Sequence, residues 1–160
     1  MRILSLDEQE SIFPAPEGGY FFKPVILSAG LKAWGCHVDT LPENLMVQLK
    51  QEYQTCFDKL KGHISDAQSQ GRAVFVKEHI SFMLDPVAWT KVLFPEQDTK
   101  QVPWTVNVPE QPRSTHSPLN VTILPDEFLQ LWKPTFLIRH PALVFPSIYR
   151  ATLDLEGKEY

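Results

Sequence analysis

The chain has 160 residues, of which 43% are hydrophobic and 11% aromatic, and its formal net charge is −4 at pH 7. This length supports one domain with a hydrophobic core, and the apolar content excludes a generally disordered protein. The charge balance lacks the basic excess that nucleic-acid-binding proteins normally show. No nucleic-acid partner is therefore predicted.

Two cysteines, Cys36 and Cys56, lie far apart, form no CxxC pair and have no histidine at zinc-ligand spacing. We interpret them as thiols of a reducing compartment, the alternative being one disulfide or a redox pair. No apolar run reaches the roughly 18 residues that a membrane span needs, and residues 1–6 are too short for a secretory signal. The sequence accordingly predicts a cytoplasmic protein with no membrane contact.

The N-terminal quarter carries few regular patterns. Residues 2–6 fit a short strand, and residues 7–19 form a loop punctuated by proline and glycine. Residues 21–27 fit an edge strand or an extended segment, because Pro24 cannot donate to a sheet ladder. No Gly-rich phosphate-binding loop occurs here.

The clearest predicted element is a helix over residues 40–70. Apolar residues recur there at steps of three and four, which indicates one helix face packed in the core. This stripe consists of Leu45, Leu49, Tyr53, Phe57, Leu60, Ile64 and Ala67. Thr40 and Glu43 have the spacing of a capping box at the helix start, and Gly71 suits a C-terminal cap.

Residues 72–80 predict a strand. Strict alternation places Lys77 and His79 on one face and Val76 and Glu78 on the other. A helix followed by a strand, repeated later in the chain, indicates parallel crossovers and an α/β fold. A lysine and a histidine at a strand end are compatible with a ligand site and equally with a structural role.

The middle of the chain predicts short elements around a long loop. Residues 85–94 fit a helix with Asp85 as its N-cap. Residues 95–118 carry five prolines among polar residues, which predicts a loop or insertion. A strand over residues 119–124 and a short helix over residues 126–132 follow.

The most informative motif is TFLIRHPALVFPSIYR, residues 135–150. Its apolar run, residues 136–138, predicts a buried strand, and Pro141 stands at the first position of a following helix. Arg139 would then lie at a strand's carboxyl end, where open α/β sheets bind ligands, beside a helix N-terminus that favours anions. Ser147 can offer a hydroxyl from the same helix. Alternatively, the arginine pairs with a surface carboxylate and the serine faces solvent.

Two segments together resemble the P-loop-fold sulfotransferases that use 3′-phosphoadenosine 5′-phosphosulfate. FLIRHPALVFPSIYR resembles their 3′-phosphate-binding segment, in which a serine follows a strand-end arginine by eight residues, as Ser147 follows Arg139. VKEHISFMLDP resembles their lysine-x-histidine segment at the end of an earlier strand, which Lys77 and His79 match. The resemblance covers residues 40–155.

The resemblance implies a role for each of these four residues. His79 would be the general base that removes the acceptor's proton, and Lys77 would neutralise charge on the sulfuryl group. Arg139 and Ser147 would hold the 3′-phosphate. The implied co-substrate is 3′-phosphoadenosine 5′-phosphosulfate without a metal, and the implied acceptor is a hydroxyl of a small metabolite. The implied fold is a partial three-layer α/β/α arrangement, helix-rich, with a mainly parallel sheet.

The sequence departs from this family in two places. Residues 1–19 lack its phosphate-cradling loop, and its glycine-rich segment near the C-terminus is also missing. Residues 1–160 are therefore expected to form a single incomplete domain, either a truncated product or an incomplete gene model. Sulfuryl transfer would be impaired because the donor is not positioned. The long spacing between His79 and Arg139 is similar to that of divergent bacterial and fungal members, many from secondary-metabolite gene clusters.

Two other functional hypotheses stay open at this stage. A non-catalytic accessory protein derived from the same fold would bind a partner protein, or a second copy of itself, through an open sheet edge. Another P-loop-type phosphotransferase would share the sheet and the strand-end anion site, and ATP binding would distinguish it from a sulfate-donor enzyme. The sequence does not identify the acceptor.

Overall fold

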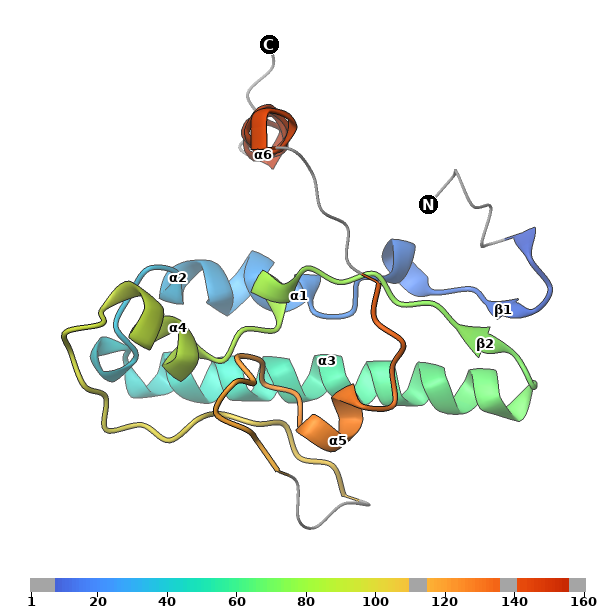
Figure 1. Cartoon of the computed structure of the whole chain (residues 1–160), viewed down its shortest axis with the longest axis horizontal. Helices are drawn as coiled ribbons and strands as arrows, with labels where there is room; N and C mark the ends of the chain where they lie inside the picture. The colour runs from blue at the N-terminus through green and yellow to red at the C-terminus, as the bar shows by residue number, and fades with distance from the viewer. Residues whose placement is uncertain (1–7, 110–114, 136–140, 156–160) are drawn as a thin grey trace.

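The structure is a computed structural model that describes residues 8–109, 115–135 and 141–155. It is a mixed fold of helices with a small parallel sheet, and its longest element, α3 (Glu43–Ser69), runs through the middle of the molecule in Figure 1. In chain order the other elements are β1 (Ile12–Phe13), η2 (Pro16–Gly19), α1 (Lys23–Val25), η3 (Ile26–Gly30), α2 (Leu31–Ala33), η4 (Val38–Thr40), β2 (Ala73–Val74), η5 (Ile80–Phe82), α4 (Pro86–Leu93), α5 (Asp126–Leu129) and α6 (Pro141–Leu155).

The start of α3 differs from the predicted capping box. The Thr40 hydroxyl donates to the His37 carbonyl at 2.7 Å, and Pro42 is the N-cap residue without a side-chain hydrogen bond. The reason is Pro42 itself, because a proline disfavours helical backbone at the preceding residue. Leu41 is extended, with ψ at 136°, so the helix cannot begin before Glu43.

The end of α3 confirms the predicted glycine cap. Gly71 has a φ of 62°, a left-handed conformation that favours glycine. Its N–H donates to the Gln68 carbonyl at 3.0 Å, and the Arg72 N–H donates to the Ala67 carbonyl at 2.9 Å. This pair of bonds is a Schellman motif, which satisfies carbonyls that the helix leaves open.

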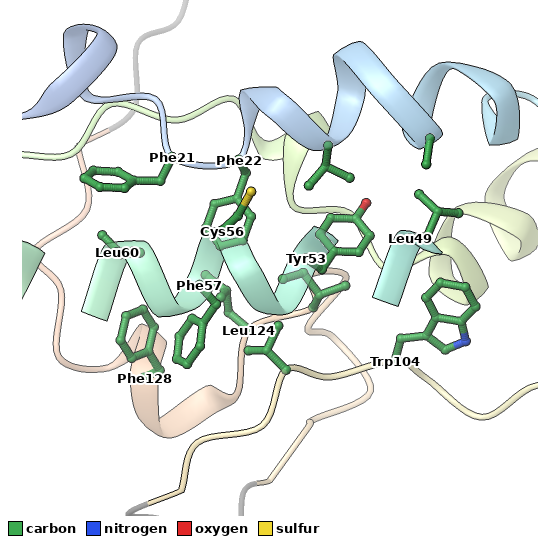
Figure 2. Close-up of a cluster of buried hydrophobic side chains, with 14 of the residues drawn as sticks. Phe21, Phe22, Leu49, Tyr53, Cys56, Phe57, Leu60, Trp104, Leu124 and Phe128 are labelled. Carbon is green, nitrogen blue, oxygen red and sulfur yellow. The ribbon is translucent and has the colours of Figure 1, made fainter. Parts of the chain in front are cut away.

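The core lies along one face of α3, where segments from two sides of the helix meet. Its predicted apolar stripe is confirmed, with Leu49, Tyr53 and Phe57 among the buried residues. Figure 2 shows Phe22 on one side of α3 and Phe128 on the opposite side. Two layers of chain therefore pack against this helix.

The two cysteines are both free, as predicted. Cys36 is exposed, and Cys56 is buried within the core of α3. Burial raises the pKa of the Cys56 thiol to about 11, so this thiol stays protonated and unreactive at neutral pH.

The sheet consists, in the described part of the chain, of β1 and β2. They pair in parallel, with Ile12 opposite Ala73 and Phe13 opposite Val74, and the crossover between them contains α3. The parallel crossover was predicted, but the strand over residues 72–80 is reduced to two residues. The partner strand runs into Pro14, which has no N–H to donate, so the ladder ends there. The predicted strands over residues 2–6 and 136–138 lie outside the described residues.

The predicted edge strand over residues 21–27 is wrong, because this stretch turns into helix. Pro24 occupies the second position of α1, where a missing N–H costs no hydrogen bond. Phe22, Val25 and Ala29 recur at helical spacing, and all three are fully buried. This helical face covers α3, and Figure 1 shows α1 and α2 lying along it.

The Asp85 cap of α4 is confirmed. Its carboxylate accepts the N–H groups of Val87 at 3.1 Å and Ala88 at 3.2 Å, and also that of Trp104 at 3.1 Å. Asp85 thereby joins the start of α4 to the proline-rich segment. Burial raises the pKa of this carboxyl, while the three backbone donors oppose that rise.

The described parts of residues 95–118 contain no helix or strand. They nevertheless contribute to the core, because Trp104, Val106 and Val108 are buried in alternation with exposed neighbours. The predicted strand over residues 119–124 is reduced to a single antiparallel bridge, Leu84 with Thr122. The helix predicted after it is present as α5, shorter than expected.

The predicted C-terminal helix is present as α6, which begins at Pro141. Figure 1 shows α6 apart from the body formed around α3. Its Phe145, Ile148 and Tyr149 are exposed. Within the described ranges, no helix has both the length and the apolar character needed to cross a membrane.

Candidate functional site

Lys77 and His79 lie in the extended stretch between β2 and η5, and Figure 1 shows the chain that leaves β2 running on toward α4. Side-chain exposure alternates along this stretch: Lys77 and His79 are exposed, whereas Val76 and Glu78 are half-buried. The predicted division of faces is therefore confirmed, although most of the predicted strand has no ladder partner in the part of the chain that the structure describes. The two candidate residues project toward solvent on the same side.

The N-terminal chain lies directly beside this stretch. The Lys77 N–H donates to the Gly19 carbonyl at 3.1 Å. The Glu78 carboxylate accepts the Phe22 N–H at 2.9 Å and also the Phe21 N–H. Gly19 has a φ of 94°, which a residue with a Cβ rarely adopts, and this turn directs the following residues along the site.

Tyr20 joins the two candidate residues. Its ring stacks on the His79 ring with centroids 5.4 Å apart and planes 19° apart, and its hydroxyl lies 3.4 Å from His79 Nε2. The Lys77 Nζ lies 4.9 Å from the centroid of the same ring, a cation–π distance. Phe82 packs edge-on against His79 at 4.9 Å. The four side chains form one aromatic and basic cluster.

Lys77 gives the exposed side of the cluster a positive charge, and its Nζ lies over the Tyr20 ring. Glu78 faces away from the cluster, and its Oε2 is buried without a hydrogen-bond partner in the described chain. Burial raises the pKa of Glu78 to about 7, against the lowering effect of the Phe22 and Phe21 N–H groups.

The other two candidate residues are not joined to this cluster. Arg139 lies outside the described residues. Ser147 is half-buried in α6, and Figure 1 shows that helix apart from the stretch that carries Lys77 and His79. The described residues also contain no group of three or more histidine, cysteine or carboxylate side chains that could hold a metal ion.

Sequence reasoning missed Tyr20 and Glu78. Glu78 was assigned to the correct face, but its partners are backbone N–H groups more than fifty residues away, at Phe21 and Phe22. Tyr20 begins an aromatic run without helical or strand periodicity. The one local signal was the Gly18–Gly19 pair before it, which marks a turn.

Comparisons with known proteins find two curated sulfotransferases that resemble this chain along nearly its whole length. No known family profile matches the chain, and no solved structure matches it. A curated protein of Metarhizium rileyi named sulfotransferase ppzF is 44% identical over 163 residues, which cover 99% of this chain and 47% of that protein. Its namesake from Metarhizium majus is 42% identical with the same coverage. Along nearly its whole length, and over about half the length of these relatives, the chain is sulfotransferase-like in sequence.

Proposed function

We propose that this chain forms part of a sulfotransferase that transfers a sulfuryl group from 3′-phosphoadenosine 5′-phosphosulfate to a hydroxyl of a small metabolite. The observation that carries the proposal is the pairing of Lys77 with His79 on one exposed side, around Tyr20. The names of the two relatives support the reaction class. A cytoplasmic role in secondary metabolism is the setting that we propose for it.

His79 is the proposed general base. A histidine titrates near neutral pH and can accept the proton of a hydroxyl, and His79 is exposed where an acceptor could approach. In the proposed reaction, the acceptor oxygen bonds to sulfur, its proton passes to His79, and the bond from sulfur to the donor's phosphate breaks. The other product is adenosine 3′,5′-bisphosphate.

Lys77 is the proposed electrostatic partner. A positioned ammonium stabilises negative charge on the sulfuryl oxygens as the transfer proceeds. The Tyr20 ring, 4.9 Å from Nζ, restricts where that ammonium lies without neutralising it. Lys77 therefore suits the sulfuryl end of the donor in charge and in exposure.

Arg139 and Ser147 are the proposed ligands of the donor's 3′-phosphate. An arginine can bind a phosphate by two charge-assisted hydrogen bonds, and a serine hydroxyl can add a third. We propose that residues 136–138 add a strand to the β1–β2 sheet, which would make the fold a partial three-layer α/β/α arrangement. This strand would bring Arg139 to the edge where Lys77 and His79 lie.

Transfer by this chain alone is expected to be weak. Residues 1–19 contain no loop that combines glycine with a lysine or arginine and a serine or threonine, the usual means of orienting a phosphate by backbone N–H groups. Binding of the nucleotide product is therefore a better test than turnover.

The test is a thermal-shift measurement with adenosine 3′,5′-bisphosphate. If the dissociation constant is about one hundredth of the nucleotide concentration, the bound state gains about 2.7 kcal/mol, or roughly 5–10 °C in Tm for a chain of this size. Arg139→Ala should abolish the shift. Arg150→Ala, on the exposed surface of α6, is the matched control and should retain it.

Two outcomes would contradict the proposal. One is the absence of any shift at millimolar adenosine 3′,5′-bisphosphate. The other is a larger shift with ATP than with the bisphosphate, which would favour a phosphotransferase instead.

A further inference from the structure

A cavity of about 370 Å³ adjoins the Lys77–His79 cluster. It lies between the N-terminal segment and α3, and its lining residues are Pro16, Tyr20, Phe21, Pro24, Lys59, Gly62, His63 and Asp66. This volume falls in the range of small-molecule pockets. The rings of Tyr20 and Phe21 in the lining favour a flat, mostly apolar ligand. Lys59 and Asp66, the charged residues of the lining, are exposed to solvent.

Gly62 leaves the space open on the α3 side. It lies inside a helix, where glycine costs about 1 kcal/mol relative to alanine. A Cβ built on Gly62 would meet nothing within 4 Å. Lys59 and Asp66 flank it at helical spacing, and His63 is the next residue along the chain. The cavity is thus open at this position, where a long side chain would take up part of its volume.

His63 is the most buried polar residue of the lining, with 9% of its surface exposed. Its ring lies between Phe13 at 4.9 Å and Phe21 at 5.1 Å. Its Nε2 is buried without a hydrogen-bond partner among the described residues. Burial lowers the pKa of His63, which favours its neutral form. Buried polar groups normally have a hydrogen-bond partner, so an unpartnered nitrogen in a cavity wall is unusual.

Tyr20 connects the cavity to the proposed base, because it lines the cavity and also stacks on His79 at 5.4 Å. We propose that the cavity over Gly62 is the acceptor pocket, which holds the flat apolar body of a hydroxylated compound while its hydroxyl reaches His79 past Tyr20. This inference rests on the proposed sulfotransferase function. It assigns the fit of the acceptor to Gly62 and His63.

The test uses 2-naphthol as the probe, in an NMR titration of the whole chain. Wild type and Gly62→Ala should bind it, with the largest shifts at Tyr20, His63 and His79. Gly62→Leu should weaken binding at least about tenfold, since its side chain occupies the cavity. Gly62→Gln has similar reach without adding apolar surface and should do the same. Far-UV circular dichroism confirms that each variant is folded.

The result that overturns the inference is equal binding of 2-naphthol by wild type, Gly62→Leu and Gly62→Gln, or no binding by wild type at millimolar probe. Adenosine 3′,5′-bisphosphate is added to the same samples as an independent readout. If adenosine 3′,5′-bisphosphate still gives a shift but the Gly62 variants bind 2-naphthol as tightly as wild type, the acceptor pocket is overturned. The proposed function is then unaffected. If wild type shows no shift with adenosine 3′,5′-bisphosphate but the Gly62 variants bind 2-naphthol more weakly than wild type, the pocket is supported as a ligand site. That result contradicts the sulfotransferase function.

Discussion

At the scale of single residues, Glu78 joins the two segments that build the candidate site. It stands between Lys77 and His79 but faces inward, and its carboxylate holds the backbone of Phe21 and Phe22. Tyr20 is held next to His79 as a consequence. The half-buried Glu78 carboxylate therefore positions the basic cluster from the inner side of the chain. It adds no negative charge to the exposed side of the cluster.

Glu78 should make stability depend on pH. Its folded-state pKa of about 7 lies above the ordinary value, so between about pH 4.5 and pH 7 the folded state keeps a proton that the unfolded state releases. Stability should fall as pH rises through this window. Glu78→Gln keeps an acceptor for both N–H groups but does not ionise, so it should be more stable than wild type above pH 7.

The expected gain is on the order of 1 kcal/mol, because partial exposure screens the charge. Thermal melts of both proteins from pH 4.5 to pH 8 measure it. Glu96→Gln, at an exposed position, is the control and should follow wild type. Parallel melting curves for wild type and Glu78→Gln would refute this role of Glu78.

At the scale of elements, local patterns predicted the helices better than the strands. The period of residues 40–70 and the caps at Gly71 and Asp85 depend on neighbours within one turn, and the structure confirms them. The length of a strand depends on a partner that is distant in the sequence. Because β1 ends just before Pro14, β2 is short, and the residues of β2 alone do not reveal this.

Gly71 and Gly62 offer a matched pair of substitutions within α3 and its cap. Gly71→Ala should destabilise the protein by about 1 kcal/mol, because φ is 62° there. Gly62→Ala should stabilise it by up to about 1 kcal/mol, since the position is helical and open. Urea unfolding of both variants measures the difference. Effects of the same sign would contradict the assigned backbone conformations.

At the scale of the whole molecule, α3 is covered on two sides, and the second side comes partly from the proline-rich segment. Trp104 is 5% exposed, and the Lys50 Nζ lies 4.5 Å from its ring centroid. The sequence of residues 95–118 predicted a loop, and the described part of this segment contains no helix or strand. The contribution of this segment to the core could not be predicted, because three alternate apolar residues among prolines form too short a pattern to indicate burial.

Trp104→Ala should therefore destabilise the whole fold by about 3–5 kcal/mol, as expected for loss of a buried tryptophan. Val102→Ala, two residues earlier and 76% exposed, should change stability by no more than about 0.5 kcal/mol. Equilibrium denaturation separates the two cases. A small effect at Trp104 would show that this segment is not part of the core.

Strand alternation and a family resemblance singled out Lys77 and His79, and the structure confirms only that the two side chains share one exposed side; their roles stay predictions. Tyr20 and the cavity over Gly62 could not be predicted, because they arise from packing between distant segments. Arg139 stays a prediction of the sequence alone.

The proposed function requires that this chain recognise the 3′-phosphate of a nucleotide, which calorimetric titration can measure. Adenosine 3′,5′-bisphosphate and adenosine 5′-monophosphate differ only in that phosphate. We expect the bisphosphate to bind at least about tenfold more tightly, a difference of about 1.4 kcal/mol, and Arg139→Ala to remove this preference. Equal affinities for the two nucleotides, or no heat of binding from the bisphosphate at millimolar concentration, would contradict it.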